Sequence, residues 1–323
     1  MTTYILDSLD RIPTLTHTAV TVGSYDGVHL GHRAIISRLC KEAAVRRLSS
    51  LLITFHPHHR AFFGHDREPF LLTDRDEKLM LLGRTGVEHI VVLPFARPLA
   101  GLTAAEFIRD IVLERLGAEL FLVGHDQAIG CDQRRGPVAI GALAGPLGVE
   151  VASVAPVVEG EEPVSSTRIR AALHAGDLEQ ASRLLGYPYL LTGRVVHGDA
   201  RGRVLGYPTA NVVVAEPLKL IPAEGVYAVT ADIPDGTAKG MLYIGRRPTF
   251  GEGPQVIELF LLDYAGDLYR ANVRVHLLER LRGDMTFASV EELTRQIRRD
   301  EVRTRDLFQT AGADVLDRTT YAP

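Results

Sequence analysis

The sequence has little of what marks secreted, membrane-spanning or disulfide-rich proteins. It contains two cysteines in 323 residues, Cys40 and Cys131, and their spacing matches no disulfide or metal motif. The N-terminal stretch has no basic region before an apolar run, so it predicts no signal peptide, and no apolar stretch is long enough to span a bilayer. These absences lead us to expect a protein of the reducing cytoplasm.

Lysine is also scarce, and none of the four lysines follows a glycine. The Gly-Lys-Ser/Thr end of the common phosphate-binding loop is therefore absent, so any use of ATP must depend on another device. The net charge of −4 does not favour nucleic acid or an anionic membrane as the main partner. With 46% hydrophobic and 24% charged residues, the chain is an ordinary globular one of one large or two ordinary domains.

The first half alternates short apolar runs with helical segments. The apolar runs predict strands at 18–22, 50–55, 89–95, 119–124 and 149–154, and the segments between them predict helices at 33–46, 74–82 and 103–116. Thr103 and Glu106 form a capping box at the start of the last helix. Strands separated by helices are typical of a parallel sheet, so we expect a doubly wound, Rossmann-like α/β domain of about five strands.

The second half changes character near Leu185, where a short helix that starts after Asp177 ends. Glycine and proline then recur, and β-like segments follow at 193–198, 209–215, 225–233, 240–245, 256–264 and 272–281. A last helix is expected from Ser289, capped with Glu292, to about Arg299. We therefore predict an α/β domain at 1–186 and, at 187–323, a small antiparallel β-barrel with a terminal helix.

The stretch GSYDGVHLGH, residues 23–32, joins the first predicted strand to the first helix. In open α/β sheets, ligands bind at this edge, and a helix N-terminus suits phosphate. His29 and His32 are three residues apart, so both can donate hydrogen bonds to phosphate oxygens from one helix face. The loop also supplies Asp26 and the glycines Gly23, Gly27 and Gly31, which let the backbone approach a ligand. The alternative is an ordinary pair of surface or core histidines.

A second candidate phosphate site is VSSTRIRAAL, residues 164–173, after the last predicted strand of the α/β domain. Ser166, Thr167 and Arg168 place two hydroxyls and a guanidinium at a helix N-terminus, where they could hold the far phosphates of ATP. The alternative is that the hydroxyls only cap the helix.

Three motifs carry a family resemblance. The His-x-Gly-His of residues 29–32 resembles the nucleotidyltransferase superfamily, and Ser-Ser-Thr-Arg-Ile-Arg at 165–170 matches the FAD synthetases within it. Residues 202–211, Gly-Arg-Val-Leu-Gly-Tyr-Pro-Thr-Ala-Asn, resemble the riboflavin kinase signature. Nearly the whole chain is thus similar to the bacterial bifunctional riboflavin kinase/FAD synthetases. The resemblance implies that the second domain makes FMN from riboflavin and ATP, and that the first joins FMN to AMP from a second ATP, giving FAD and pyrophosphate.

The resemblance also implies residue roles. His29 and His32 would neutralise the reacting phosphates, Asp26 would orient the loop or contact the nucleotide, and Glu258 would be the base that activates riboflavin. Thr209 and Asn211 would bind Mg²⁺. The remaining nucleotide and phosphate contacts would come from Gly23, Gly27, Gly31, Asp126, Ser166, Thr167, Arg168, Gly202, Arg203, Gly206, Pro208 and Thr209. Two alternatives stay open: Glu258 on the polar face of its strand, and Thr209 in an ordinary Pro-Thr turn.

Several residues depart from the family pattern. Gln127 and Ile129 replace two phenylalanines near the expected flavin and nucleotide pocket, and Arg270 replaces a glycine in the kinase domain; Ser24 and Tyr243 replace common asparagines. These departures keep two alternatives open: a riboflavin kinase whose first domain is inactive or altered, and a flavin-binding regulatory protein. A cytidylyltransferase would share the His-x-Gly-His loop but not the second domain.

Four histidines, His56, His58, His59 and His65, lie together after the second predicted strand. Their ligand type would suit zinc, but both cysteines lie elsewhere, and we favour a ligand-proximal loop at the end of the strand. The sequence does not indicate an oligomeric state.

Overall fold

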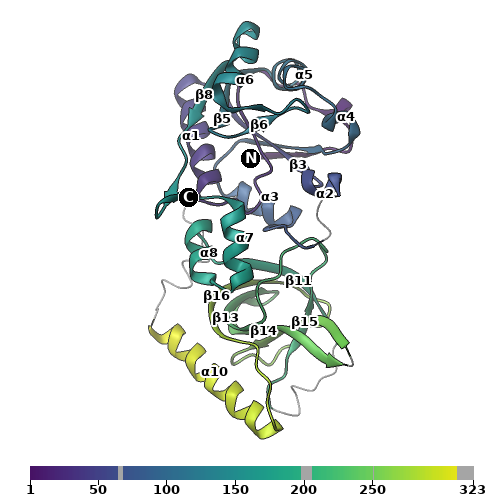
Figure 1. Ribbon diagram of the computed structural model, residues 1–323, viewed down its shortest axis with the longest axis vertical. Helices are drawn as coiled ribbons and strands as arrows, with labels where there is room; N and C mark the ends of the chain where they lie inside the picture. Colours follow the sequence, from purple (N-terminus) through teal and green to yellow (C-terminus); the bar gives the residue numbers. More distant parts are fainter. Residues whose placement is uncertain (65–67, 198–205, 250, 311–323) are drawn as a thin grey trace. The chain divides into compact units, whose positions relative to one another are not determined.

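The computed structural model describes residues 1–64, 68–197, 206–249 and 251–310 (Figure 1). The chain divides into two compact units, the first formed by Met1–Glu68 and Asp74–Ser165, the second by Pro69–Thr73 and the residues from Ser166 on. This division precedes the junction expected near 186. The reason is that α7 (Ser166–Ala175) and α8 (Leu178–Leu185) belong with the second unit, where α8 contacts β16 (Asn272–Gly283). Among the described residues, no helix combines the length and the apolar character needed to cross a membrane.

The first unit is built on a six-stranded parallel sheet. In spatial order its strands are β1 (Thr2–Ile5), β4 (His89–Pro94), β3 (Ser49–His56), β2 (Thr18–Val22), β5 (Ala118–Gly124) and β8 (Glu150–Val154). The doubly wound fold and its five predicted strands are confirmed. The edge strand β1 was not predicted, because its residues are mostly exposed and form no buried apolar run.

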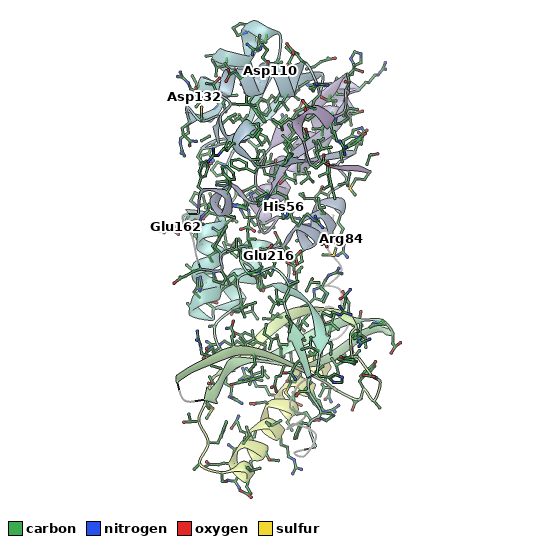
Figure 2. The ribbon with its side chains drawn as sticks, turned by 90° about the vertical axis from the view of Figure 1, so that its right-hand side faces the viewer. His56, Arg84, Asp110, Asp132, Glu162 and Glu216 are labelled. Atoms are coloured by element: carbon green, nitrogen blue, oxygen red, sulfur yellow. The ribbon has the colours of Figure 1, made fainter. Side chains whose placement is uncertain are left out.

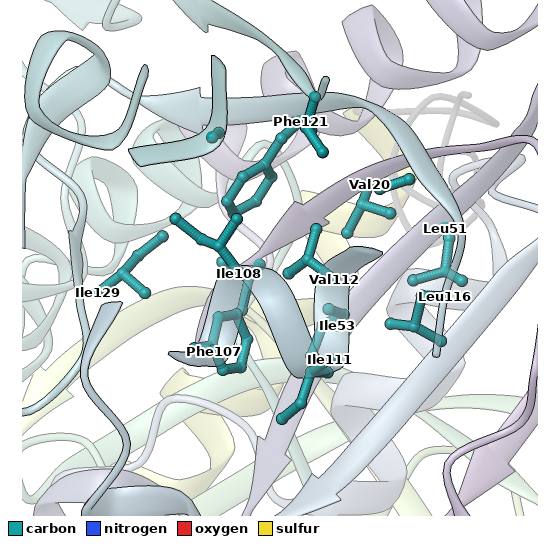
Figure 3. Packing of buried hydrophobic residues seen from close by; sticks show 14 of the residues in the cluster. Val20, Leu51, Ile53, Phe107, Ile108, Ile111, Val112, Leu116, Phe121 and Ile129 are labelled. Carbon is teal, nitrogen blue, oxygen red and sulfur yellow. The ribbon is translucent and has the colours of Figure 1, made fainter. Parts of the chain in front are cut away.

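Helices cover both faces of this sheet. On one face, α1 (Leu30–Arg46) buries Ile36 and Leu39; on the other, the helical segment η2 (Phe107–Leu113) packs Phe107 and Ile111 into the cluster shown in Figure 3. The other elements of this unit are η1 (Leu9–Arg11), α2 (His59–Phe63), α3 (Arg75–Gly83), α4 (Arg97–Ala100), α5 (Ala104–Glu106), β6 (Ala128–Ile129), β7 (Arg134–Arg135), α6 (Gly136–Ala144), η3 (Gly145–Leu147), β9 (Val158–Glu159) and β10 (Glu162–Pro163).

The helix predicted at 103–116 differs in type. Its capping box between Thr103 and Glu106 is present, but after the single turn of α5 the chain winds as a π-helix. The bond from Glu114 N to Arg109 O, 2.9 Å long, spans five residues. Periodicity alone does not separate these two windings, because both bury an apolar stripe.

The second unit contains a closed antiparallel barrel, as predicted. Its strands follow the order β11 (Leu190–Val196), β12 (Ala210–Val213), β15 (Gly251–Leu261), β14 (Gly236–Thr249), β13 (Gly225–Ile233) and β16. The terminal helix α10 (Val290–Thr310) runs beyond the predicted end at Arg299, because Ile297 and Leu307 continue its apolar stripe over the barrel. A partly buried ion pair of 2.9 Å, from Arg282 Nε to Oδ2 of the buried Asp300, also holds this helix.

Gly130 packs against the start of α5 and gives the first prediction. Its φ is +76°, and a Cβ there would overlap the backbone of Thr103 and Ala104. Left-handed strain and forced overlap together predict that Gly130→Ala lowers the free energy of unfolding by about 2–5 kcal/mol. Gly148→Ala is the matched control, since Gly148 has φ +81° and nothing within 4 Å of its Cβ position; we expect about 1–2 kcal/mol. Denaturant unfolding measures both, and equal losses would refute the overlap.

Candidate active sites

The loop between β2 and α1 is tightly folded at the carboxyl edge of the sheet. Three of its residues, Tyr25, Gly27 and Val28, have positive φ angles of 49°, 85° and 37°. Tyr25 is buried, and its hydroxyl lies 2.9 Å from Thr21 Oγ1 on β2. Left-handed conformations of non-glycine residues cost free energy and persist where the surroundings enforce them, often at functional sites. The loop therefore delivers the next residue, His29, in a defined position.

His29 and His32 form one rigid pair at the start of α1. His29 is the N-cap residue, and its Nδ1 accepts the backbone N–H of His32 at 3.3 Å. The two rings stack with centroids 3.6 Å apart and an interplanar angle of 16°. Because Nδ1 of His29 is an acceptor, Nε2 carries the proton of its neutral ring and is the donor. As predicted, the two histidines lie on one face of the helix, where their rings are in direct contact.

The electrostatics of His32 favour its neutral form. Burial lowers the pKa of its imidazole well below the usual value, and His29 and Lys78 lower it further. Its Nδ1 is buried and has no hydrogen-bond partner within the described part of the chain. A neutral imidazole has one N–H donor and one acceptor, so His32 can donate one hydrogen bond to a bound phosphate without adding a positive charge there.

Gly31 lies beneath the first ring of this pair. A Cβ at Gly31 would come 3.1 Å from His29 Cε1 and 3.2 Å from its Nδ1. From the sequence, the loop glycines were expected to let the backbone come close to a ligand. For Gly31 the structure adds a second reason, namely the close approach of the His29 imidazole.

Lys78 is a residue that the sequence analysis missed. It is buried on α3, and its Nζ donates to Phe55 O at 2.9 Å, Thr54 Oγ1 at 3.2 Å and Ser24 O at 3.3 Å. Burial lowers its pKa to about 8, while the carboxylate of buried Asp26 acts in the opposite direction. The available signal was a lysine on the apolar stripe of a helix, three and four residues before two buried leucines.

The departures in the segment after β5 have structural explanations. Gln127 accepts from Gly124 N at 2.9 Å and donates to Val22 O at 2.7 Å, so its side chain joins the carboxyl ends of β5 and β2. Ile129 is buried in the core cluster beside Phe107 (Figure 3). Asp126 is exposed and lies 3.6 Å from the exposed His125. Gln127 thus links two strand ends and Ile129 packs in the core, while the weakened pocket wall stays a prediction.

An aromatic cluster lies at the carboxyl ends of β3 and β4, where Phe95 N donates to the backbone oxygen of His56 at 3.2 Å; His56 is labelled in Figure 2. Phe95 contacts Phe55, Phe62 and Phe63 edge-on, with centroid distances of 5.5 to 5.9 Å. Phe63 is 52% exposed although it is large and apolar. This cluster has no local signal in the sequence, because its members come from three separate segments.

The neighbouring histidines have local structural roles. His58 caps α2 by accepting Arg60 N at 3.2 Å, and its ring stacks on His59. The described residues include no group of three histidine, cysteine, aspartate or glutamate side chains placed to hold a metal. His65 lies outside the described residues.

In the second unit, a cavity of about 690 Å³ opens beside the barrel strands β11, β12 and β15. Pro208, Thr209 and Asn211 line it. Thr209 Oγ1 donates to Glu258 Oε2 at 3.3 Å, and Asn211 pairs directly with Glu258 across the β12–β15 ladder. The structure therefore brings together the threonine, asparagine and glutamate that the sequence predicted as one site.

Two stacked aromatic rings also line this cavity. The rings of His197 and Tyr269 stack with centroids 3.6 Å apart, and the guanidinium of Arg270 lies 5.1 Å from the Tyr269 ring centroid. Arg270, which stands where the family pattern has a glycine, adopts a left-handed conformation with φ +67°. Its contact with Tyr269 offsets part of that strain.

Four further residues were singled out in the sequence of the second unit, and the structure describes two of them. Tyr243, opposite Glu258, donates to Asp284 at 3.2 Å, and burial raises the pKa of its hydroxyl to about 12. Gly206 is exposed with φ +80°. Gly202 and Arg203 lie outside the described residues.

The predicted pyrophosphate residues begin a helix, as expected. Ser166, Thr167 and Arg168 form the first turn of α7; Thr167 is exposed and the other two are half-buried. Their approach to His29 and His32 stays a prediction.

Comparison with known proteins gives matches to both halves of the chain. A family model described as FAD synthetase matches residues 12–168, and one described as riboflavin kinase matches residues 185–308. The bifunctional riboflavin kinase/FMN adenylyltransferase of Escherichia coli K12 is 38% identical over 90% of this chain and 92% of its own length. The same enzyme of Pseudomonas fluorescens is 39% identical over 89% and 92%, and that of Bacillus subtilis 34% identical over 88% and 90%.

A solved structure is similar as well. The crystal structure described as a macrolide-efflux protein from Streptococcus pneumoniae has a TM-score of 0.85 and 32% sequence identity, and the match covers 94% of this chain and 98% of that one. The similarity therefore extends over both compact units.

Proposed function

The chain belongs to the family of bifunctional riboflavin kinase/FMN adenylyltransferases, and from that premise we propose which of its residues carry out each step. The enzyme phosphorylates riboflavin to FMN with ATP, and it joins FMN to AMP from a second ATP with release of pyrophosphate. The observation that carries the residue assignment is that each half holds a compact polar site at its family motif: the stacked His29–His32 pair and the Thr209–Asn211–Glu258 group.

We assign the adenylyltransferase to residues 1–186 and the kinase to 187–323. The FAD synthetase model at residues 12–168 and the riboflavin kinase model at residues 185–308 support the assignment, the second beginning within two residues of this junction. A cytoplasmic location is part of the proposal, because both cysteines are free thiols and the substrates include ATP.

In adenylyl transfer, an FMN phosphate oxygen attacks the α-phosphorus of ATP, and the bond to pyrophosphate breaks. Nε2–H of His29 and the ring of His32 donate to the phosphate oxygens on which negative charge grows. The N-terminus of α1 adds a partial positive charge. Ser166, Thr167 and Arg168 hold the departing pyrophosphate, Asp26 fixes the loop, and Asp126 and the loop glycines face the nucleotide.

The flavin ring of FMN is assigned to the aromatic cluster around Phe95. A flat, conjugated ring system stacks favourably on exposed aromatic side chains, and Phe63 is the exposed member of the cluster. We expect Phe63→Ala to raise KM for FMN about tenfold, since the lost stacking is worth about 1.4 kcal/mol. Phe63→Tyr keeps the ring and should keep the KM. Steady-state FAD formation measures both, and an unchanged KM in Phe63→Ala would remove the flavin from this cluster.

In the kinase step, Glu258 takes the proton of the riboflavin 5′-hydroxyl while its oxygen attacks the γ-phosphorus of ATP. Thr209 donates to the Glu258 carboxylate and orients it, which supports the role. The cavity beside Thr209 and Asn211 receives the nucleotide, with Pro208, Gly206, Gly202 and Arg203 around its phosphates. The stacked rings of His197 and Tyr269 then face the adenine base of ATP.

We propose Mg²⁺ as the metal of this step. Thr209, Asn211 and Glu258 offer hydroxyl, amide and carboxylate oxygens within one small region, and hard cations such as Mg²⁺ prefer oxygen ligands. Thr209 and Asn211 would hold the ion. When bound, it neutralises phosphate charge, which a phosphate-loop lysine does in other proteins.

A product assay tests the assignment of both activities. Purified protein receives ATP and Mg²⁺, with riboflavin in one tube and FMN in another, and the products are separated by liquid chromatography. FAD in both tubes is the expected result. FMN without FAD in the first tube, and no FAD in the second, would instead mean a riboflavin kinase with an inactive first domain.

A further inference from the structure

Lys78 is a buried cation whose hydrogen bonds are all made within the protein. Its side chain is 6% exposed, and a buried ammonium group costs free energy unless it is compensated. Nζ has three N–H donors and faces three acceptors, the oxygens of Ser24, Thr54 and Phe55. Because no donor remains for a substrate, any effect of Lys78 on the reaction must pass through these partners.

The three acceptors connect the catalytic loop to the sheet. Thr54 and Phe55 lie near the end of β3, while Ser24 lies in the β2–α1 loop, five residues before His29. Thr54 Oγ1 also donates to Ser24 O at 3.1 Å, so that one carbonyl receives two side-chain donors. Loop and strand are therefore joined next to the point where the backbone takes three left-handed conformations.

We propose that Lys78 is a positioning residue for adenylyl transfer, whose ammonium group fixes the β2–α1 loop so that His29 and His32 meet the reacting phosphates in one geometry. The proposal rests on the assignment of His29 and His32 to that step. Catalysis by positioning is sensitive to small displacements, and a shift of about 1 Å can cost about 100-fold in rate.

The charge state of Lys78 supplies a readout that a purely structural role would not give. Burial lowers its pKa to about 8, so it is mainly protonated at pH 7 and loses its charge above pH 8. The neutral amine keeps two donors for three acceptors. The charged or titratable groups around it are Asp26 in the loop and His32 on α1. At the start of its own helix α3, the carboxylates of Asp74 and Glu77 accept from each other's backbone N–H groups. FAD formation should therefore fall above about pH 8.

Three variants test the proposal with the full chain. Lys78→Met removes the charge at similar length, Lys78→Arg keeps it, and Lys41→Met alters an exposed lysine on α1. With FMN and ATP as substrates, we expect Lys78→Met to lower kcat for FAD formation about 100-fold, with both KM values within about threefold. Lys78→Arg should recover most of the rate and lose the fall above pH 8, because arginine stays protonated. Lys41→Met should behave as wild type.

The possible outcomes separate this proposal from the one it rests on. A wild-type kcat in Lys78→Met, together with a large loss in His32→Ala, overturns the role of Lys78 alone. Wild-type rates in both variants overturn the assignment of the histidines. If Lys78→Met shows no cooperative thermal unfolding, Thr54→Val replaces it, since it removes one acceptor and the second bond to Ser24. We expect that variant to lose about tenfold in kcat, and an unchanged kcat would refute the proposal.

Discussion

His32→Ala should lower kcat for FAD formation from FMN by about 100- to 1000-fold, the loss that follows removal of one preorganised donor to a developing negative charge. Riboflavin phosphorylation by the same preparation should stay within about twofold of wild type, because that chemistry is assigned to the barrel domain. The expected loss is large because His32 acts with His29 as a stacked pair, and removing one ring also frees the other from its ring contact.

The measurement is a pair of steady-state assays, one with FMN and one with riboflavin as the flavin substrate. His32→Asn retains one N–H donor and should lose less than His32→Ala. His17→Ala is the matched control, since His17 is an exposed histidine of the same unit, paired with Glu119 at 2.6 Å. Equal losses of both activities in His32→Ala would contradict two separate active sites.

Much of the fold could be predicted because each element has its own local signal. Strands β2 and β3 of the first unit are buried along most of their length, and buried parallel strands are rich in apolar residues on both faces. The capping box of Thr103 with Glu106 and the N-cap bond of Asp177 with Gln180 N each join residues three apart. The exposed strand β1 and the π-helical winding of η2 lack a local signal, since pairing partners and tertiary packing decide them.

The candidate sites were predictable to the extent that each is contiguous in sequence. His29 and His32 lie within one turn of a helix, so their proximity follows from the helix period. Lys78 bonds to Ser24 of the same loop although the two residues are 54 positions apart in the sequence. Likewise, Phe95 at the end of β4 contacts two phenylalanines of α2, which follows β3. Such contacts depend on the order of strands in the sheet, which a pattern of apolar residues does not specify.

At the positions that depart from the family pattern, residue type also fails to predict which contacts a side chain makes. The replacement of two phenylalanines by Gln127 and Ile129 predicted a weakened pocket wall. In the structure Gln127 bridges two strand ends through its amide, and Ile129 fills the core. These contacts show what each replacement does in the protein, and the weakened pocket wall stays a prediction. The similarity to bifunctional enzymes gives no support to an inactive first domain.

Glu258→Gln should lower kcat for FMN formation about 100- to 10,000-fold, the usual contribution of a positioned general base, and leave FAD formation from FMN near wild type. Glutamine has nearly the same shape, and its side-chain oxygen can still accept from Thr209 Oγ1, so the local geometry is preserved while the proton acceptor is lost. The effect therefore isolates proton removal from binding, and KM for riboflavin and ATP should change by less than about threefold.

The matched control is Glu279→Gln, a glutamate of barrel strand β16 that pairs with Arg303 at 2.6 Å. It changes the same charge on the same barrel without touching the proposed site, and its kinase rate should equal that of wild type. The Glu258 result also bears on the alternative reading of this residue. A glutamate that lies on the polar face of a strand without a chemical role would lose nothing on conversion to glutamine, so FMN formation at a near-normal rate in Glu258→Gln would assign the proton transfer to another group.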